Sequence, residues 1–135
     1  MRLVQDDLTA ARIFERAFGF PVVPPFAGLL VIDDDNVPHG AIILNGFHRG
    51  MNVDVSAIGE RCWTVGVMRD LARYLFVRLG VRRVTGKVRK DNRKARKALK
   101  ALGFREEGKL RDYWQDGHPA IVYGLTAREQ KLVRI

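Results

Sequence analysis

Basic side chains are concentrated in one stretch of this chain, between Arg82 and Arg111. The stretch contains 13 Lys and Arg residues against 3 acids, an excess of +10, whereas the remaining residues hold 11 bases and 12 acids. The formal net charge of +9 therefore belongs to one region of the fold. Because a local positive field attracts anions, we expect a nucleic acid, an acidic protein surface or a phosphorylated cofactor near it.

Few other side chains are candidates for chemistry. His39 and His48 can each act as a base near neutral pH, although polar loop residues beside Pro38 and Arg49 are the more ordinary interpretation. Cys62 is the single cysteine, so no internal disulfide can form, and its position before a predicted helix can lower a thiol pKa. His, Cys and Asp residues nowhere have the spacing of metal ligands, and we predict no metal site.

The composition is that of one folded domain. The 135 residues suffice for a single hydrophobic core, and 47% apolar with 29% charged residues excludes the disordered class. Apolar runs such as Gly28–Ile32 are far shorter than the ~20 residues of a membrane span, and the N-terminus lacks the pattern of a signal peptide. We therefore expect a cytoplasmic protein with one domain over residues 1–135.

Hydrophobic periodicity predicts the elements of the first half. Apolar residues at helical spacing indicate a helix from about Asp7 to Phe18, ended by Gly19. Two β-rich runs, Leu29–Ile32 and Ala41–Phe47, flank a polar turn and predict a hairpin. Alternation of apolar residues over Asn52–Ile58 predicts the next strand.

The longest helix signal opens near Trp63 and ends at Gly80. Val81–Arg89 then alternates and predicts a strand. The helix carries an apolar stripe at i, i+3 and i+4 spacing that consists of Met68, Leu71, Ala72, Leu75, Phe76 and Leu79.

A second helix begins after Asp91 or Asn92, either of which can cap it, and ends at Gly103. Phe104–Trp114 and Ala120–Thr126 then flank an Asp-Gly pair, which predicts a hairpin with a type I′ turn. The order of elements is that of an α/β or α+β domain with a mixed sheet. The second helix has an apolar face of Ala95, Ala98, Leu99 and Leu102 opposite a basic face of Arg93, Lys94, Arg96, Lys97 and Lys100.

A set of residues at fixed spacing in this second half reads Asn92-(x)2-Ala95-(x)6-Leu102-Gly103-Phe104-(x)2-Glu107-Gly108-(x)2-Arg111. This set resembles the C-terminal signature of GCN5-related N-acetyltransferases (GNAT). The resemblance is strongest to the branch of ribosomal-protein N-acetyltransferases, and the short chain is similar to compact versions from bacteriophage genomes.

The resemblance implies the GNAT fold, a mixed and mostly antiparallel sheet with flanking helices, whose two central strands splay apart to admit acetyl-CoA. Asn52–Ile58 would be the first of these strands, with Val55 and Ala57 hydrogen-bonding the pantetheine arm as an added strand would. The pyrophosphate would bind at the N-terminus of the helix that follows. The resemblance also implies that Asn92 contacts the pantetheine and that Lys97 meets the 3′-phosphate.

Two positions depart from the family pattern. The phosphate loop of the family carries small residues, whereas in the loop Gly59–Thr64 Cys62 and Thr64 stand at those positions with Trp63 between them. We therefore expect the phosphates to be held less closely, or to be held by the Arg61 side chain and the Thr64 hydroxyl. Leu99 occupies the place of a tyrosine that many members use as a proposed general acid.

The resemblance places Asp54 and Ser56 on the strand that lines the transfer site. A carboxylate there can deprotonate the acceptor amine, directly or through a water, so both residues are candidates for catalysis. The alternative is that both side chains point outward from a half-exposed strand.

The sequence thus predicts an acetyl-CoA-dependent N-acetyltransferase that acts by direct attack of an amine, which can be a protein N-terminus, a lysine or a small amine. A catalytically inactive domain of the same shape remains an alternative. It would bind nucleic acid, the ribosome or an acidic protein through the basic face, although that face can also be merely solvated. Only about 28 residues precede the first hairpin, so we expect an open acceptor groove or one completed by a second subunit in a homodimer.

Overall fold

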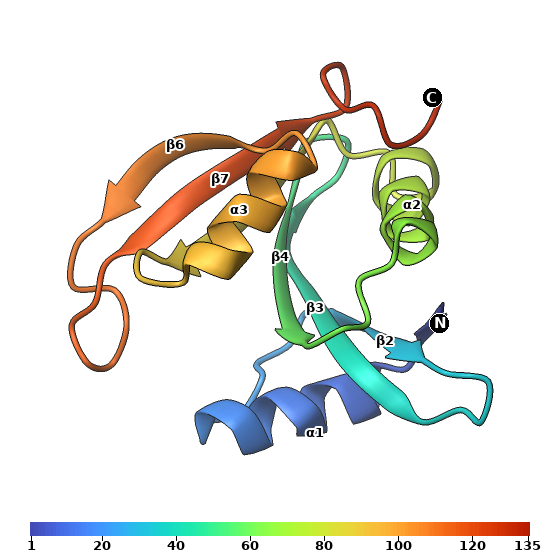
Figure 1. The fold of residues 1–135 in the computed structure, drawn as a ribbon, viewed down its shortest axis with the longest axis horizontal. Coiled ribbons are helices and arrows are strands. Elements are labelled where there is room, and N and C mark those ends of the chain that lie inside the picture. Colours follow the sequence, from blue (N-terminus) through green and yellow to red (C-terminus); the bar gives the residue numbers. More distant parts are fainter.

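Seven β-strands form one sheet, ordered β1-β2-β3-β4-β5-β7-β6, in the computed structural model, which describes residues 1–135 (Figure 1). The strands are β1 (Arg2–Gln5), β2 (Ala27–Ile32), β3 (Pro38–His48), β4 (Asn52–Gly59), β5 (Arg83–Arg89), β6 (Arg105–Leu110) and β7 (Ala120–Thr126). The helices are α1 (Asp7–Phe18), α2 (Val65–Arg73), which continues as the π-helical turn η1 (Tyr74–Arg78), and α3 (Arg93–Ala101). None of the helices has the length and apolar character that a membrane span requires.

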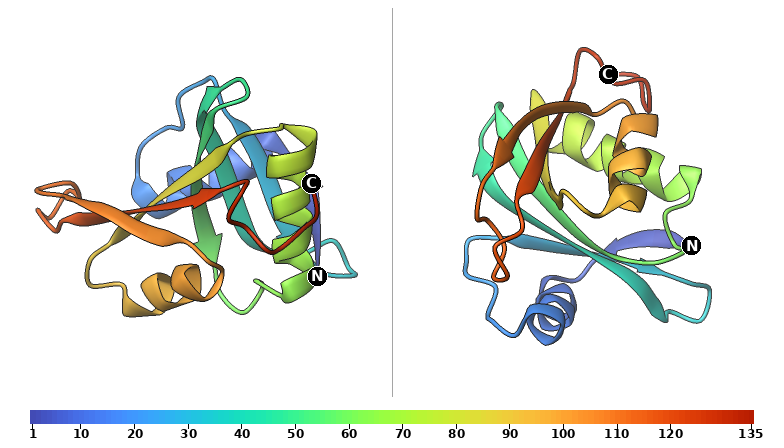
Figure 2. Two further views of the ribbon diagram at one scale, coloured as in Figure 1. Left: turned by 90° about the horizontal axis from the view of Figure 1, so that it is seen from above. Right: turned by 60° about the vertical axis from the view of Figure 1, so that its left-hand side comes forward.

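The pairing of the strands confirms the predicted mixed, mostly antiparallel sheet. Every neighbouring pair is antiparallel except β4 and β5, which run parallel because α2 and η1 connect them. Figure 2 shows β6 and β7 extending beyond the rest of the sheet with α3 beside them.

The two faces of the sheet are covered by different helices. α1 lies across β2 and β3 on one face, which we call the outer face (Figure 1). Side chains alternate along a strand, so Leu30 packs with α1 while Leu29 packs with α2 on the inner face. α3 is also on the inner face, because its Arg96 donates a hydrogen bond to the hydroxyl of the buried Tyr123 of β7.

The main hydrophobic core lies on the inner face, between the sheet and α2 with η1. The predicted apolar stripe of the long helix is confirmed, since Leu71, Ala72, Leu75 and Phe76 are all buried there. The sheet contributes Leu29, Ile42, Leu44, Val53, Val84 and Leu125 to the same cluster. On the outer face β5, β7 and β6 carry no helix.

The parallel pairing between β4 and β5 is short. It joins Asn52 to Arg83 and ends at the pair Val55 and Gly86. Beyond that pair β4 continues to Gly59 against β3 alone, and β5 continues against β7 alone. In Figure 2 the two strands run apart toward their ends. The predicted splay of the central strands is therefore confirmed, and we call the gap the split.

Two elements, β1 and the long helix, differ from the sequence-based expectation. β1 was not predicted, because four residues that include Arg2 at an edge give no alternation long enough to read. The long helix begins at Val65 and not at Trp63, since Thr64 is its N-cap. Its last turn is π-helical and ends at Arg78, close to the predicted stop.

The predicted type I′ turn at Asp116-Gly117 is wrong. β6 ends at Leu110, and residues 111–119 separate it from β7. The Trp114 N–H donates to the His118 carbonyl (3.1 Å) and the Gly117 N–H to the Trp114 carbonyl (2.8 Å). Gly117 has φ +85°, so the turn has three residues, with glycine in the left-handed position that ends a type I turn.

Close packing where β3 begins and β4 ends explains the burial of Cys62. Its thiol is fully buried, and a Cβ added at Gly40 would lie 2.7 Å from its Sγ. A Cβ at Gly59 would lie 3.0 Å from the same sulfur. The two glycines of this cross-strand pair thus leave the space that the cysteine fills.

We expect Gly40→Ala to lower the free energy of unfolding by about 1–3 kcal/mol, because the added methyl overpacks the site of Cys62. Urea denaturation measures this loss. Gly108→Ala is the matched control, since a Cβ at Gly108 meets nothing within 4 Å, and we expect a change within about 0.5 kcal/mol. Equal stability of the two variants would contradict this account of the packing.

Candidate functional site

The split opens the edge of β4 to solvent. Ser56 and Ala57, the first residues beyond the last parallel pair, are both exposed although β4 is central in the sheet order. Alternation along β4 puts Val53, Val55 and Ala57 on the inner face, and Asp54 and Ser56 on the outer face. Backbone groups on this edge have no strand partner and can bind an extended ligand as an added strand would.

The N-terminus of α2 follows the end of β4 and presents free donors. The Thr64 Oγ1 accepts from the Val67 N–H (3.2 Å), whereas the N–H groups of Val65 and Gly66 have no backbone acceptor. A Cβ at Gly66 would meet only the Thr64 Oγ1, at 3.9 Å, so the approach is open. Unpaired N–H groups together with the helix dipole fit a phosphate group.

The loop before α2 contains the residues that replace the family's small ones. Arg61 is exposed with φ +57° and forms no ion pair, so its guanidinium is free to bind an anion. The Thr64 hydroxyl oxygen already accepts the capping bond, and its proton is free to be donated to an anion. Burial raises the pKa of the Cys62 thiol, which makes it a packing residue and not a reactive one. The Trp63 indole donates to the Gly59 carbonyl (3.1 Å) and closes the loop.

Asn92 is the N-cap of α3, one of the two predicted caps. Its Oδ1 accepts from the Ala95 N–H (3.1 Å), and no protein group accepts from its Nδ2. Lys97 is exposed on the same helix. α3 has no fully buried residue, and its apolar side is only partly covered where Leu99 lies.

Arg96 does not belong to the exposed basic face on which the sequence placed it. Its Nε donates to the Tyr123 hydroxyl (3.0 Å), its Nη1 to the Lys90 carbonyl (2.9 Å) and its Nη2 to Glu106 (3.4 Å). The bonds to Tyr123 and Glu106 attach α3 to β7 and β6, and the Tyr123 hydroxyl, followed by Glu106, raises the pKa of Arg96. The helical wheel could not show this, because the acceptors come from other elements.

Asp54 lies on the outer face beside the last parallel pairs. Its Oδ1 accepts from the Asn52 side-chain amide (3.0 Å). Its Oδ2 lies against Gly46, which has φ +58° in the irregular end of β3, and any side chain there would collide with the carboxylate. Ser56, two residues on, is exposed on the same face.

The two histidines lie apart from each other. His39 Nε2 is 2.8 Å from the Asp33 carboxylate at the tip of the β2–β3 hairpin. That bond contributes most to holding the pKa of Asp33 below its ordinary value. His48 Nδ1 is 3.1 Å from the Gly46 carbonyl, so His48 and the Asp54 carboxylate both lie beside Gly46.

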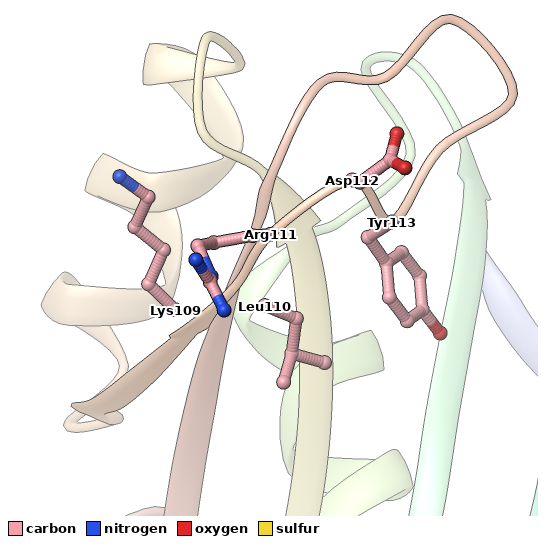
Figure 3. Close-up of a pocket in the computed structure, with 5 residues that line it drawn as sticks. All are labelled: Lys109, Leu110, Arg111, Asp112 and Tyr113. Atoms are coloured by element: carbon pink, nitrogen blue, oxygen red, sulfur yellow. The ribbon is translucent and has the colours of Figure 1, made fainter.

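A hollow of about 670 Å³ lies at the end of β6 (Figure 3). It is lined by Lys109, Leu110, Arg111, Asp112 and Tyr113. In Figure 3, Lys109 and Arg111 extend on one side of the strand end and Tyr113 on the other. The lining includes no residue of β4, β5 or α2, so this hollow is separate from the split. The Lys87 Nζ lies 6.0 Å from the Tyr113 ring, which puts the tyrosine beside the outer face of β5.

An ionic cluster joins the β6–β7 turn to the start of α3, and sequence reasoning missed it. Arg89 bonds to Asp91 through Nε (3.1 Å) and to Asp116 through Nη2 (2.9 Å). His118 Nδ1 lies 3.1 Å from the same Asp116. Hydrogen bonds from Arg89 and then from the His118 N–H hold the pKa of Asp116 well below its ordinary 3.8. The cluster fixes the residues next to Asn92.

We expect Asp116→Asn to lower the urea midpoint at neutral pH, because it breaks the cluster. A carboxyl whose folded-state pKa is lowered stabilises the fold above the unfolded-state value of about 4 and loses this effect as pH falls through the folded-state pKa. The difference in urea midpoint between Asp116→Asn and the wild type will therefore become smaller below about pH 4. Asp34→Asn, at an exposed acid without an ion pair, is the control. A difference that stays constant with pH would contradict the assignment.

No protein-family model and no curated protein matches the chain. Among solved structures, a probable acetyltransferase is 28% identical with a TM-score of 0.63. The match covers 77% of this chain and 62% of that one, so this chain spans less than two thirds of its length.

Two further structures match over more of this chain. A spermidine N-acetyltransferase from Vibrio cholerae has a TM-score of 0.77 at 14% identity, over 93% of this chain and 95% of that one. A ribosomal-protein-S5-alanine acetyltransferase from Vibrio fischeri has a TM-score of 0.68 at 16% identity, over 92% and 70%. The split sheet and these matches agree with the resemblance in the sequence. The fold of this chain is that of the GNAT acetyltransferases.

Proposed function

We propose that this protein is an acetyl-CoA-dependent N-acetyltransferase. The observation that carries the proposal is the split between β4 and β5, which lies next to the free N–H groups of Val65 and Gly66. The exposed edge of β4 suits a pantetheine amide arm, and the helix N-terminus suits a pyrophosphate. Two more side chains supply hydrogen-bond donors: Arg61, in the loop before α2, and Asn92, whose Nδ2 at the start of α3 is unpaired.

The protein's own residues are assigned two tasks: they remove a proton from the acceptor amine, and they orient that acceptor. Acetyl-CoA supplies an activated acetyl thioester when it is bound. Asp54 takes a proton from the acceptor amine on the outer face, the amine nitrogen bonds to the acetyl carbon, and the carbon–sulfur bond breaks to release the thiolate. Ser56, on the same face at the split, is placed to hydrogen-bond the acceptor. Leu99 cannot protonate the thiolate, so solvent is assigned that step.

For the acceptor we favour the terminal amine of a peptide over a polyamine. Among the cations of β5 and β6 that point to the outer face, Arg83, Arg89 and Arg105 are in ion pairs, whereas Lys87 is not. An acceptor with several positive charges would be repelled by Lys87, while a single amine needs only Asp54. A peptide with a free N-terminal alanine and spermidine are suitable test acceptors, because they represent the acceptors that two proteins of this fold are named for.

Isothermal titration with acetyl-CoA tests the binding site. We expect a Kd on the order of 10 µM for the wild type. Gly66→Glu adds a negative charge at the free N–H groups, so we expect about tenfold weaker binding, equal to about 1.4 kcal/mol. Because a carboxylate suits a helix N-terminus, the thermal midpoint will not fall, and binding and folding are thereby separated.

Gly66→Gln is the matched control, with the same length and no charge, and we expect it to bind nearly as the wild type does. If the wild type shows no heat with millimolar acetyl-CoA, the proposed function is wrong. If both variants bind equally, the pyrophosphate lies elsewhere.

A second candidate function, nucleic-acid binding, is favoured by the basic face of α3. Arg93, Lys94, Lys97 and Lys100 are exposed and in no ion pair, unlike Arg96. An unpaired cationic surface binds phosphate backbones by releasing counterions. We expect the triple change Lys94→Glu, Lys97→Glu and Lys100→Glu to weaken binding of a duplex RNA and to reduce its salt slope by about 3.

A triple change at the exposed C-terminal bases, Arg128→Glu, Lys131→Glu and Arg134→Glu, gives the same net charge and is the control. Equal loss in both triples would mean that net charge alone attracts the RNA. Unchanged affinity in the α3 triple would remove this candidate.

A further inference from the structure

A chain of hydrogen bonds runs across the outer face from β6 to Asp54. Arg83 of β5 forms an ion pair with Glu107 of β6 (2.5 Å) and donates through Nε to the Thr85 hydroxyl (3.1 Å). Thr85 donates to the Asn52 Oδ1 (2.7 Å), and the Asn52 Nδ2 donates to the Asp54 Oδ1 (3.0 Å). Thr85 and Asp54 are cross-strand partners in the pair just before the final one between β4 and β5. The series of hydrogen bonds therefore ends beside the split.

The donors and acceptors in this series of hydrogen bonds can be arranged in only one direction, from Arg83 toward Asp54. A guanidinium can only donate, so the Thr85 hydroxyl accepts from Arg83 and uses its own proton toward Asn52. The amide oxygen of Asn52 is therefore turned to Thr85 and its NH₂ to Asp54. Each bond polarises the next, and the last one fits an ionised carboxylate, which only accepts.

The surrounding backbone is shaped for the same arrangement. Glycine at position 46 leaves the space that the Asp54 Oδ2 occupies, and its carbonyl accepts a second bond from the Asn52 Nδ2 (3.3 Å). Glycine at position 124 leaves room for the ion pair, since a Cβ there would lie 2.5 Å from both Arg83 and Glu107. Glu107 is the extra residue where the β6–β7 register shifts, and the shift points it toward Arg83.

We propose that Thr85 is a positioning residue that fixes the Asp54 carboxylate beside the split, acting through Asn52 and oriented by the Arg83–Glu107 ion pair. The role of Asp54 as the base rests on the proposed function. With Oδ1 held by Asn52, the Oδ2 has no protein hydrogen-bond donor and is the atom left to accept the proton of the amine. Misplacing it by a fraction of an ångström lowers the rate without affecting acetyl-CoA binding on the inner face.

The test compares Thr85→Val, which keeps the shape and removes the hydroxyl, with Thr85→Ser, which keeps the hydroxyl. Thr126→Val is the matched control, because Thr126 lies opposite Arg83 on β7 but its hydroxyl bonds to Glu129 (2.8 Å), outside the chain. With the alanine peptide or spermidine as acceptor, we expect Thr85→Val to lower kcat about tenfold at unchanged KM for acetyl-CoA. Thr85→Ser will restore most of the rate, and Thr126→Val will not change it.

A second measurement does not depend on activity. The side-chain amide signals of Asn52 in a ¹⁵N–¹H spectrum, assigned by their loss in Asn52→Asp, will shift in Thr85→Val and stay in place in Thr126→Val. Unshifted signals in Thr85→Val, or a wild-type kcat, would overturn the inference.

Failure of the proposed function gives a different result. If Asp54→Asn turns over as fast as the wild type, Asp54 is not the base and the inference falls with it. If Asp54→Asn loses about 10²-fold or more while Thr85→Val is unaffected, the base stands and only the positioning role falls. If neither the wild type nor any variant acetylates either acceptor, the proposed acceptors are wrong. The Asn52 amide signals then decide whether Thr85 orients Asn52 and, through it, Asp54.

Discussion

The end of the pairing between β4 and β5 is the constraint on which the remaining structure depends. Backbone N–H and C=O groups need partners, and each strand beyond Val55 and Gly86 keeps a neighbour on one side only, β3 or β7. Long antiparallel ladders on both outer sides make this possible. The sheet thus holds an open edge at its centre, which a ligand with amide groups can complete as an added strand would.

Much of this arrangement could be predicted from local patterns. The apolar stripe from Met68 to Leu79 predicts the long helix, and the alternation over Asn52–Ile58 predicts β4. Both predictions succeed because burial of one face of a helix or strand sets the spacing of its apolar residues. The resemblance around Asn92 supplied the mixed, mostly antiparallel sheet and the split between its central strands. The spacing of apolar residues cannot show where β4 stops pairing with β5. Val55 and Ala57 belong to the same uninterrupted alternation, although the pairing ends between them.

What the sequence could not indicate depends on contacts between distant elements. Asp54 was expected on β4, but the hydrogen bond from Thr85 to Asn52 joins residues 33 positions apart. The cluster of Arg89, Asp91 and Asp116 likewise needs the three-residue turn, which places Asp116 against the start of α3. The space at Gly40 for Cys62 is equally invisible, since a glycine in a strand has many reasons to be there.

The pairing of charges differs on the two sides of the sheet. Arginines in the basic stretch are largely used in folding: Arg83, Arg89, Arg96 and Arg105 are all in ion pairs. The lysines of α3 have no acidic partner, so their field is not cancelled by the fold. The outer face, where three of these arginines are neutralised, is closer to balanced. In the proposed function, the phosphates of acetyl-CoA would therefore be attracted to the inner side, while the acceptor amine would approach Asp54 from the outer side without crossing that field.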